Sequence, residues 1–254
     1  MAGFSFLIFI LGACVGSFLN VCIYRIPARE SLLMPPSHCP ECGSRLGILQ
    51  LIPIISYFFL LGRCRSCRAR ISWRYPMVEG LTGLLFLLVW HVYGFSWQTA
   101  AAWIFVSVLI VVSFIDWDHY IIPDNMLLGG ILAGIPFLAL QSWTTLGWGL
   151  AAALGYGSIM GLIAFISKGG MGGGDVKLAA FLGFFLGPYL GGLALLLGFL
   201  MGGLIGIVLM LAGKKTGKDV IAFGPYLALG GLLALLKGFD IINWYLAFFC
   251  WKIL

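Results

Sequence analysis

The sequence predicts an all-α membrane protein with about eight transmembrane helices and a basic loop between the first two. Of its 254 residues, 61% are hydrophobic and only 9% are charged, and the mean hydropathy is +1.06. These values lie far outside the range of soluble globular domains. Apolar runs long enough to cross a bilayer also recur along the chain, separated by short polar segments.

Eight apolar segments account for the predicted helices. The first is expected to be a retained helix, not a signal peptide, because it has no basic n-region and no small-residue cleavage site. Gly187 and Pro188 separate the sixth segment from the seventh. The last span leaves residues 237–254 on the outer side, where they are suited either to an interfacial segment or to a further crossing. The predicted spans are residues 3–23, 77–94, 99–115, 126–141, 145–167, 176–187, 190–212 and 220–236.

The charge distribution predicts the orientation. Eight of the fifteen basic residues lie between Arg25 and Arg74, and cytoplasmic loops carry such an excess. The loop 24–75 is therefore expected in the cytoplasm, with the N-terminus outside. Alternation of the spans brings a second basic cluster, Lys214–Lys218, to the same side. Topology thus accounts for the net charge of +6 without a nucleic-acid partner.

Two cysteine pairs in the basic loop predict a metal site. Cys39 and Cys42 form one CxxC pair, and Cys64 and Cys67 form the other. This spacing directs two thiolates at one tetrahedral metal, and four thiolates would make a structural zinc site with no open position. Disulfides or redox cysteines are the alternative, which a reducing cytoplasm disfavours. The apolar run 48–61 between the pairs is expected to lie on the membrane surface.

Carboxylates at the ends of several spans predict a catalytic pair. Asp175 follows the glycine run Gly172–Gly174 and opens the sixth span, whereas Asp116, Asp118 and Asp124 follow the third span. The alternation of spans places both groups at the cytoplasmic face. Two aspartates that share one water can divide the roles of base and acid, as in an aspartyl protease. A flexible loop in which Asp175 only caps a helix is the alternative.

Other catalytic arrangements are missing from the sequence. No serine or cysteine nucleophile is recognisably paired with His38, His91 or His119, and there is no HExxH motif. The glycine run lacks the GK[ST] of a P-loop. Glu79, just inside the second span, either stabilises its helix dipole or faces a polar cavity.

In its ordered motifs the chain resembles the type IV prepilin peptidases, the A24 family of intramembrane aspartyl proteases. Gly16–Val21 with Arg25-Ile26-Pro27 resembles the opening motif, and the CxxC pairs resemble the cysteine motif. Asp116-Trp117-Asp118 with Ile122-Pro123-Asp124 resembles the first catalytic motif. Gly172–Asp175 with Lys177 resembles the GxGD motif, which is shared more loosely with presenilin-like proteases.

The resemblance implies a bifunctional enzyme of the bacterial inner membrane. It would cleave the basic leader of type IV prepilins or pseudopilins after a glycine at the cytoplasmic face, then methylate the new N-terminal amine with S-adenosylmethionine. Asp116 and Asp175 would be the catalytic pair, with Asp118 and Asp124 as rivals to Asp116. Gly172, Gly174 and Lys177 would support the second motif.

The resemblance also implies a division of labour. Residues 1–95 would form the methyltransferase part, and residues 96–254 would form a six-helix protease domain. No methyl-donor motif is visible, and the long cysteine loop is what the methylating members of the family share. Glu79, Gly16 and Asn20 are the candidates for the methyltransferase site.

Two other classes of function compete with this interpretation. A transporter with glycine-broken helices would place ionisable residues in mid-span, whereas the acids here lie near cytoplasmic ends. A zinc-dependent membrane regulator would use the loop as its functional part and the aspartates as caps. Comparing a Cys-to-Ser variant with an Asp-to-Asn variant would separate the regulator from the protease.

Overall fold

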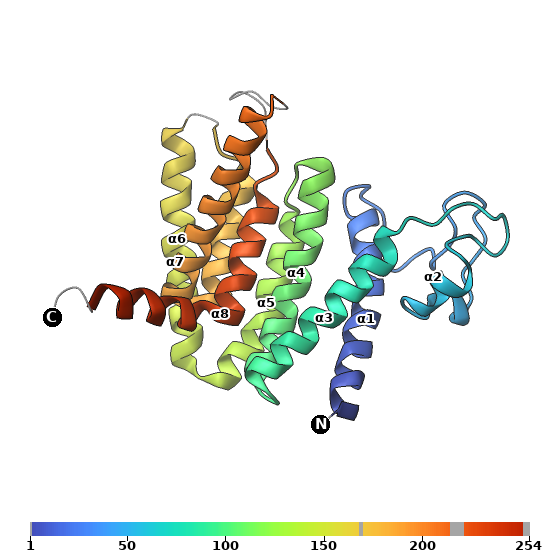
Figure 1. The fold of residues 1–254 in the computed structure, drawn as a ribbon, viewed down its shortest axis with the longest axis horizontal. Helices are drawn as coiled ribbons and strands as arrows, with labels where there is room; N and C mark the ends of the chain where they lie inside the picture. Colours follow the sequence, from blue (N-terminus) through green and yellow to red (C-terminus); the bar gives the residue numbers. More distant parts are fainter. Residues whose placement is uncertain (1, 168–169, 214–220, 251–254) are drawn as a thin grey trace. The chain divides into compact units, whose positions relative to one another are not determined.

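The computed structural model describes residues 2–167, 170–213 and 221–250. Within them every regular element is a helix, which confirms the predicted all-α class (Figure 1). The long helices are α1 (Ala2–Arg25), α3 (Arg74–Tyr93), α4 (Trp97–His119), α5 (Asp124–Gln141), α6 (Trp143–Ile166), α7 (Gly173–Leu211) and α8 (Gly224–Cys250). The short helices are η1 (Ile48–Leu51) and α2 (Ile55–Phe59).

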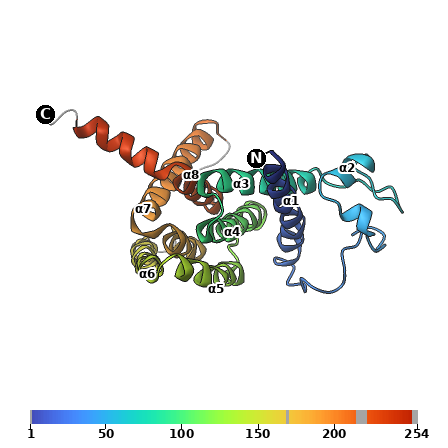
Figure 2. The same cartoon turned by 90° about the horizontal axis from the view of Figure 1, so that it is seen from below.

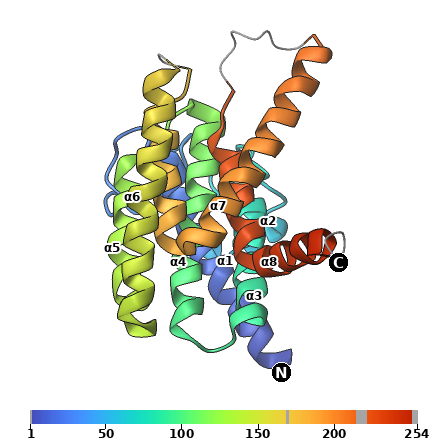
Figure 3. The ribbon, with the colours of Figure 1, turned by 90° about the vertical axis from the view of Figure 1, so that its left-hand side faces the viewer.

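All seven long helices are long and apolar enough to span a membrane. The sixth and seventh predicted spans, 176–187 and 190–212, are the two arms of α7, because this 39-residue helix is broken at Gly187, where φ is 69° and ψ is −171°. Glycine tolerates this backbone conformation, and Pro188 then opens the second arm without needing an amide hydrogen. In Figure 3 the second arm, drawn in orange, runs back toward the end from which the first arm starts. The predicted separation of two helices at this pair of residues is confirmed.

The chain divides into two compact units. The first comprises residues 1–95 with 106–111, and the second comprises residues 96–105 with 112–254. In the first unit α1 and α3 pack along each other, and the connection between them carries η1 and α2. A Cβ atom on Gly16 would lie 2.8 Å from Cα of Glu79, so the close approach of the two helices requires glycine there.

The second unit is built along α7. Helices α6 and α8 pack against its two arms, and aromatic rings fill the interior, where Phe105 of α4 stacks on Phe181 with ring centroids 5.6 Å apart. Figure 1 shows that α4 ends, and α5 and α7 begin, at the same end of this unit. The end of α8 turns away from the rest of the unit (Figures 1 and 2).

Helix boundaries correct the sequence prediction at one functional position. The third span was expected to end before Asp116, but α4 continues to His119, so Asp116 and Asp118 lie in its last turns. The helix stops at Tyr120, which adopts a left-handed conformation with φ of 57° and donates its amide hydrogen to the Asp116 carbonyl. The predicted basic cluster at 214–218 lies outside the described residues.

Candidate functional site

Asp116 is a buried carboxylate near the C-terminal end of α4. Only 5% of its surface is exposed, and its Oδ2 accepts a hydrogen bond of 2.8 Å from the backbone N–H of Gly224. Gly224 is the first residue of α8, and a Cβ atom there would lie 2.8 Å from the same oxygen. Glycine is therefore required for the start of α8 to approach the carboxylate this closely.

Asp175 lies in the first turn of α7, after the N-cap Gly172. Its backbone N–H donates to the Gly172 carbonyl at 3.1 Å, and its side chain is half-buried. The preceding residue, Gly174, faces the segment after α4, where an added Cβ atom would lie 2.8 Å from Cβ of Ile122. The glycines of this motif thus let α7 begin against the chain that leaves Asp116.

Asp116 and Asp175 lie near each other, on separate helices of the second unit. The charge of Asp116 acts electrostatically on Asp175. Two like charges close to each other repel, so a state in which one carboxyl carries a proton and the other is charged is favoured. This is the state in which one group can take a proton and the other can give one.

The two rival aspartates have different surroundings. Asp118 is exposed, whereas Asp116, two residues earlier on α4, is buried. Asp124, in the first turn of α5, pairs with Lys177 through an Oδ2–Nζ distance of 2.6 Å, and both side chains are more than half exposed. The structure therefore brings Lys177 to Asp124, and links α7 to α5 next to the Asp116–Asp175 pair.

The four predicted cysteines meet in the first unit. Their sulfur atoms all lie within 4.8 Å of one another, and the Sγ atoms of Cys39 and Cys67 are 3.8 Å apart. A tetrahedron with metal–sulfur bonds of about 2.3 Å has sulfur–sulfur edges of about 3.8 Å, so the cluster can hold a metal ion of the size of zinc. Cys39 and Cys64 are buried, whereas Cys42 and Cys67 are exposed.

Each pair sits on the same backbone turn. The Cys39 carbonyl accepts from Gly43 N–H, just as the Cys64 carbonyl accepts from Arg68 N–H. The flanking hydrogen bonds repeat as well, with Cys39 N–H donating to Ser44 and Cys64 N–H donating to Ala69. The loop therefore contains two equivalent knuckles, in which Cys64 takes the position in the second knuckle that Cys39 takes in the first.

Hydrogen bonds to the sulfur atoms favour the thiolate form at two of the four positions. At Cys67 the backbone N–H of Ala69 lowers the pKa, but desolvation and hydrogen bonds to the other three cysteines outweigh it and raise the pKa to about 12. Backbone N–H groups of Cys67 and Ser66 lower the pKa of Cys64 to about 6. Ser44 lowers the pKa of Cys42 through its hydroxyl and its backbone N–H. Thiolates are the form in which cysteine binds a metal.

The two knuckles place different residues at one shared left-handed backbone position, which gives a testable prediction. Gly43 has φ of 67°, and the equivalent residue in the second knuckle, Arg68, has φ of 62°. A residue with a Cβ atom is strained there, so Arg68→Gly is expected to stabilise the loop by about 0.5–1 kcal/mol. A chelator competition should show a few-fold tighter metal retention. Gly43→Arg is the matched control and should weaken retention; an Arg68→Gly variant no tighter than the parent would contradict the strain argument.

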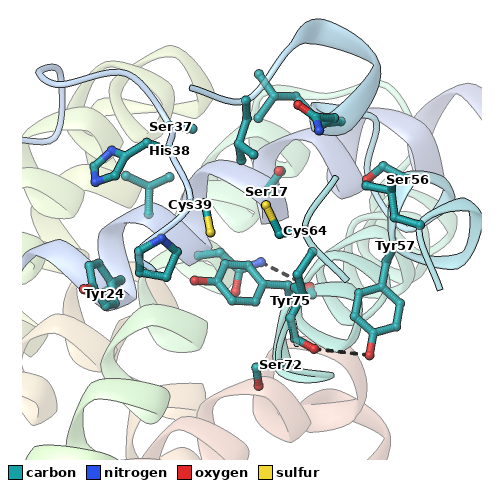
Figure 4. Close-up of a pocket in the computed structure, with 18 of the residues that line it drawn as sticks. Ser17, Tyr24, Ser37, His38, Cys39, Ser56, Tyr57, Cys64, Ser72 and Tyr75 are labelled. Carbon is teal, nitrogen blue, oxygen red and sulfur yellow. Dashed lines mark hydrogen bonds between the residues drawn. The ribbon is translucent and has the colours of Figure 1, made fainter. Parts of the chain in front are cut away.

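A cavity of about 380 Å³ lies beside the four-cysteine cluster in the first unit. Cys39 and Cys64 form part of its wall, with Ser17 and Tyr75 around the same hollow (Figure 4). Of the residues predicted for methyl transfer, Glu79 and Asn20 line the cavity. Gly16 lies directly behind Glu79, where it allows α1 to approach α3.

Glu79 holds a backbone segment in place beside the cavity. The buried Glu79 carboxylate accepts from Ile54 N–H at 2.7 Å and from the Ser17 hydroxyl. Ile54 has φ of 62° and ψ of −56°, close to the strained γ-turn conformation, and the bond from Ile55 N–H to the Pro53 carbonyl closes that turn. Glu79 thus clamps a strained turn beside the cavity.

Sequence reasoning missed two polar residues of this region. Arg25 was assigned to the basic loop and to the opening motif, yet it is 5% exposed and lines the cavity. No role was predicted for Tyr75, yet it also lines the cavity, and its carbonyl accepts from Asn20 Nδ2 at 3.1 Å. The signal that could have found them is their position, since each flanks a predicted span at the end facing the cysteine loop.

Comparison with known proteins finds two family models that match successive parts of the chain. Residues 10–93 match the bacterial peptidase A24 N-terminal domain, and residues 103–207 match the type IV leader peptidase family. No solved structure matches the chain.

Curated relatives match over nearly their full length. A protein of Aeromonas hydrophila is 39% identical, over 96% of this chain and 94% of the relative. One of Aeromonas salmonicida (strain A449) is 38% identical, over 95% and 93% respectively. One of Bacillus subtilis (strain 168) is 37% identical, over 94% and 97%. All three are named prepilin leader peptidase/N-methyltransferase. With this identity and coverage, the chain belongs to the type IV leader peptidase family.

Proposed function

We propose that this protein is a membrane-embedded leader peptidase that cleaves prepilins or pseudopilins and then methylates the new N-terminus. The relatives carry both activities in their names. The observation that carries the peptidase assignment is the pair of interacting aspartates, Asp116 and Asp175, at the ends of separate helices. No feature favours the transporter alternative, because the matched families are peptidases.

The aspartate pair can hydrolyse a peptide bond without a covalent intermediate. The ionised member takes a proton from a water molecule as the water oxygen attacks the scissile carbonyl. The protonated member gives its proton to the leaving nitrogen when the carbon–nitrogen bond breaks. Gly224 N–H donates to one Asp116 oxygen and thereby fixes the orientation of that carboxylate. Each turnover consumes one water molecule and returns the pair to one shared proton.

The four-cysteine cluster is proposed to hold one structural zinc ion. Four sulfur donors, two of them favoured as thiolates, fill a tetrahedral coordination sphere and leave no position for water or substrate. Zinc would therefore tie the two knuckles together and fix the wall of the cavity beside them. It would have no part in the chemistry of either reaction.

Methyl transfer is proposed to belong to residues 1–95, and hydrolysis to residues 96–254. S-adenosylmethionine, when bound, supplies an electrophilic methyl group. The chain must bind the freed ammonium of the peptide and remove a proton from it before nitrogen can attack. Glu79 is a buried carboxylate that lines the cavity with Asn20, so it can hold the ammonium and accept that proton.

Glu79→Gln separates this role from a structural one. The amide keeps the shape of the side chain but cannot accept a proton, so we expect prepilin to be cleaved but largely unmethylated. Mass measurement of the product reports both steps. Equal loss of cleavage and methylation, or loss of neither, would remove Glu79 from the methyltransferase site.

The protein is a multi-pass membrane protein, and we propose that it lies in the bacterial inner membrane with both sites at the cytoplasmic face. The basic loop between α1 and α3 supports this orientation, with the N-terminus outside. Reporter fusions after residue 93 and after residue 141 should report an external location, and a reporter in the cysteine loop should report an internal one.

Incubation of the purified protein with a prepilin, followed by mass measurement of the product, tests the whole proposal. We expect loss of the leader and a gain of one methyl group on the mature chain when S-adenosylmethionine is present. Without the donor, the leader alone should be lost. An intact prepilin under both conditions would overturn the proposed function.

A further inference from the structure

The cavity of the first unit combines an apolar wall with a few converging polar groups. Its volume of about 380 Å³ falls in the range of small-molecule sites. Leu51 and Leu60 contribute apolar wall, and Tyr57 and Tyr75 contribute aromatic rings. All of its lining residues lie between Ser17 and Glu79, so the first unit forms this cavity by itself.

Arg25 brings a buried positive charge to this cavity. Its guanidinium donates to two neutral carbonyl oxygens, from Nη1 to Ser31 at 2.9 Å and from Nη2 to Pro35 at 2.7 Å. Among the residues that the structure describes, no carboxylate pairs with it. A buried guanidinium has five N–H donors and is stabilised by an anion, so Arg25 retains the capacity to bind one from the cavity.

Glu79 supplies a buried charge of opposite sign in the same cavity. It comes from α3, whereas Arg25 ends α1. The Asp116–Asp175 chemistry uses neither residue. A cavity that holds one buried cation and one buried anion, each bonded to uncharged groups, is suited to a zwitterion.

We propose that this cavity binds S-adenosylmethionine, with Arg25 binding the α-carboxylate of its amino-acid part. The proposal rests on the proposed methyltransferase function and assigns the donor a place in it. The donor carries an ammonium, a sulfonium, a carboxylate and a flat adenine ring. Arg25 matches the carboxylate, Glu79 lies where positive charge can be held, and the tyrosine rings offer surfaces for the adenine or the sulfonium.

The peptide substrate fits Arg25 less well than the donor does. The end of the peptide that reacts is a new ammonium, which has no anion for a guanidinium to bind. A buried cation at that end would repel the ammonium. The anion that Arg25 can accept therefore points to the amino-acid part of the donor.

Ligand binding without catalysis tests the assignment. Calorimetric titration of the zinc-loaded protein in nanodiscs would compare S-adenosylhomocysteine, its carboxyl methyl ester and 5′-methylthioadenosine, which lacks the amino-acid part. We expect the free carboxylate to improve affinity at least about 30-fold over the ester. In Arg25→Gln this advantage should disappear, whereas the affinity for 5′-methylthioadenosine should stay within a few-fold of the parent.

A merely structural role of Arg25 predicts a different result. Loss of the Ser31 and Pro35 contacts alone would weaken all three ligands equally and lower the zinc content. Because the acid and the ester are compared in the unaltered protein, this test does not depend on whether a variant folds. Equal affinity for acid and ester, together with normal methylation of prepilin, would overturn the role of Arg25 while leaving the methyltransferase function intact. No binding and no methylation would overturn the function itself.

Filling the cavity tests its location. Leu60 lines the cavity, and its neighbour Phe59 is 84% exposed and does not. Leu60→Trp is expected to abolish binding of S-adenosylhomocysteine, whereas the matched variant Phe59→Trp should bind as the parent does. Parent-like binding by Leu60→Trp would show that the donor site lies elsewhere.

Discussion

Replacing Asp116 or Asp175 with Asn is expected to lower leader cleavage by at least about 10³-fold while leaving the protein inserted in the membrane. An amide can neither take a proton from water nor donate one to the leaving nitrogen, and acid–base catalysis of this kind contributes about 10²–10⁴-fold. Each variant removes one member of an interacting pair, so each should lose nearly all activity. Cleavage of a purified prepilin, measured over hours, gives the range of rates that is needed to detect this loss.

Asp118→Asn is the matched control for Asp116→Asn. The two residues lie in the last turns of α4, but Asp118 is exposed and Asp116 is buried against Gly224. Asp118→Asn should therefore retain cleavage within a few-fold of the parent. Retained cleavage in Asp116→Asn, with loss in Asp118→Asn or Asp124→Asn, would transfer the catalytic role to the rival.

Removing the metal should unfold the cysteine loop. Gently purified protein is expected to contain one zinc ion per chain, and Cys39→Ser to contain much less. In small metal modules the binding free energy, on the order of 10 kcal/mol, is largely folding free energy. Because Cys39 and Cys64 form part of the cavity wall, the loss should also abolish methyl transfer. Metal analysis by mass spectrometry reports the loss of zinc, a proteolysis assay reports the unfolding of the loop, and the mass of the processed prepilin reports the loss of methyl transfer.

Cys14→Ser is the control for cysteine substitution in general. Cys14 is an exposed residue of α1, outside the metal cluster. The Cys14→Ser variant should keep its zinc and resist proteolysis as the parent does. Substoichiometric zinc in the parent, or unchanged zinc in Cys39→Ser, would contradict the metal assignment.

The sequence was sufficient for the helices and the four-cysteine cluster because their signals are local. Apolar length defines the spans, and the Gly187-Pro188 pair marks the break in α7 where the structure has it. The CxxC spacing likewise fixes how each cysteine pair is presented. These features depend on neighbouring residues along the chain, so one sequence reveals them.

The choice among the aspartates depends on contacts that are distant in sequence. Residues two apart on a helix point about 200° apart, so only packing decides whether Asp116 or Asp118 faces the interior. The N–H that bonds Asp116 belongs to Gly224, 108 residues later. Arg25 shows the same limit. A cation beside a span is typical of a membrane boundary, and its burial follows only from the fold of residues 31–35 around it.

The break in α7 also determines how far its first arm reaches into the membrane. The first arm has 14 residues and rises about 21 Å, whereas the second arm and α6 each have 24 and rise about 36 Å. A hydrocarbon layer is about 30 Å thick, so only the longer helices can reach across it. The arm that carries Asp175 in its first turn therefore ends inside the layer. There Tyr156 of α6 donates its hydroxyl hydrogen to the Pro188 carbonyl and so satisfies it within the protein. This re-entrant arm has no loop at the far surface. Its neighbouring helices therefore hold the arm and its carboxylate at a fixed level along the membrane normal.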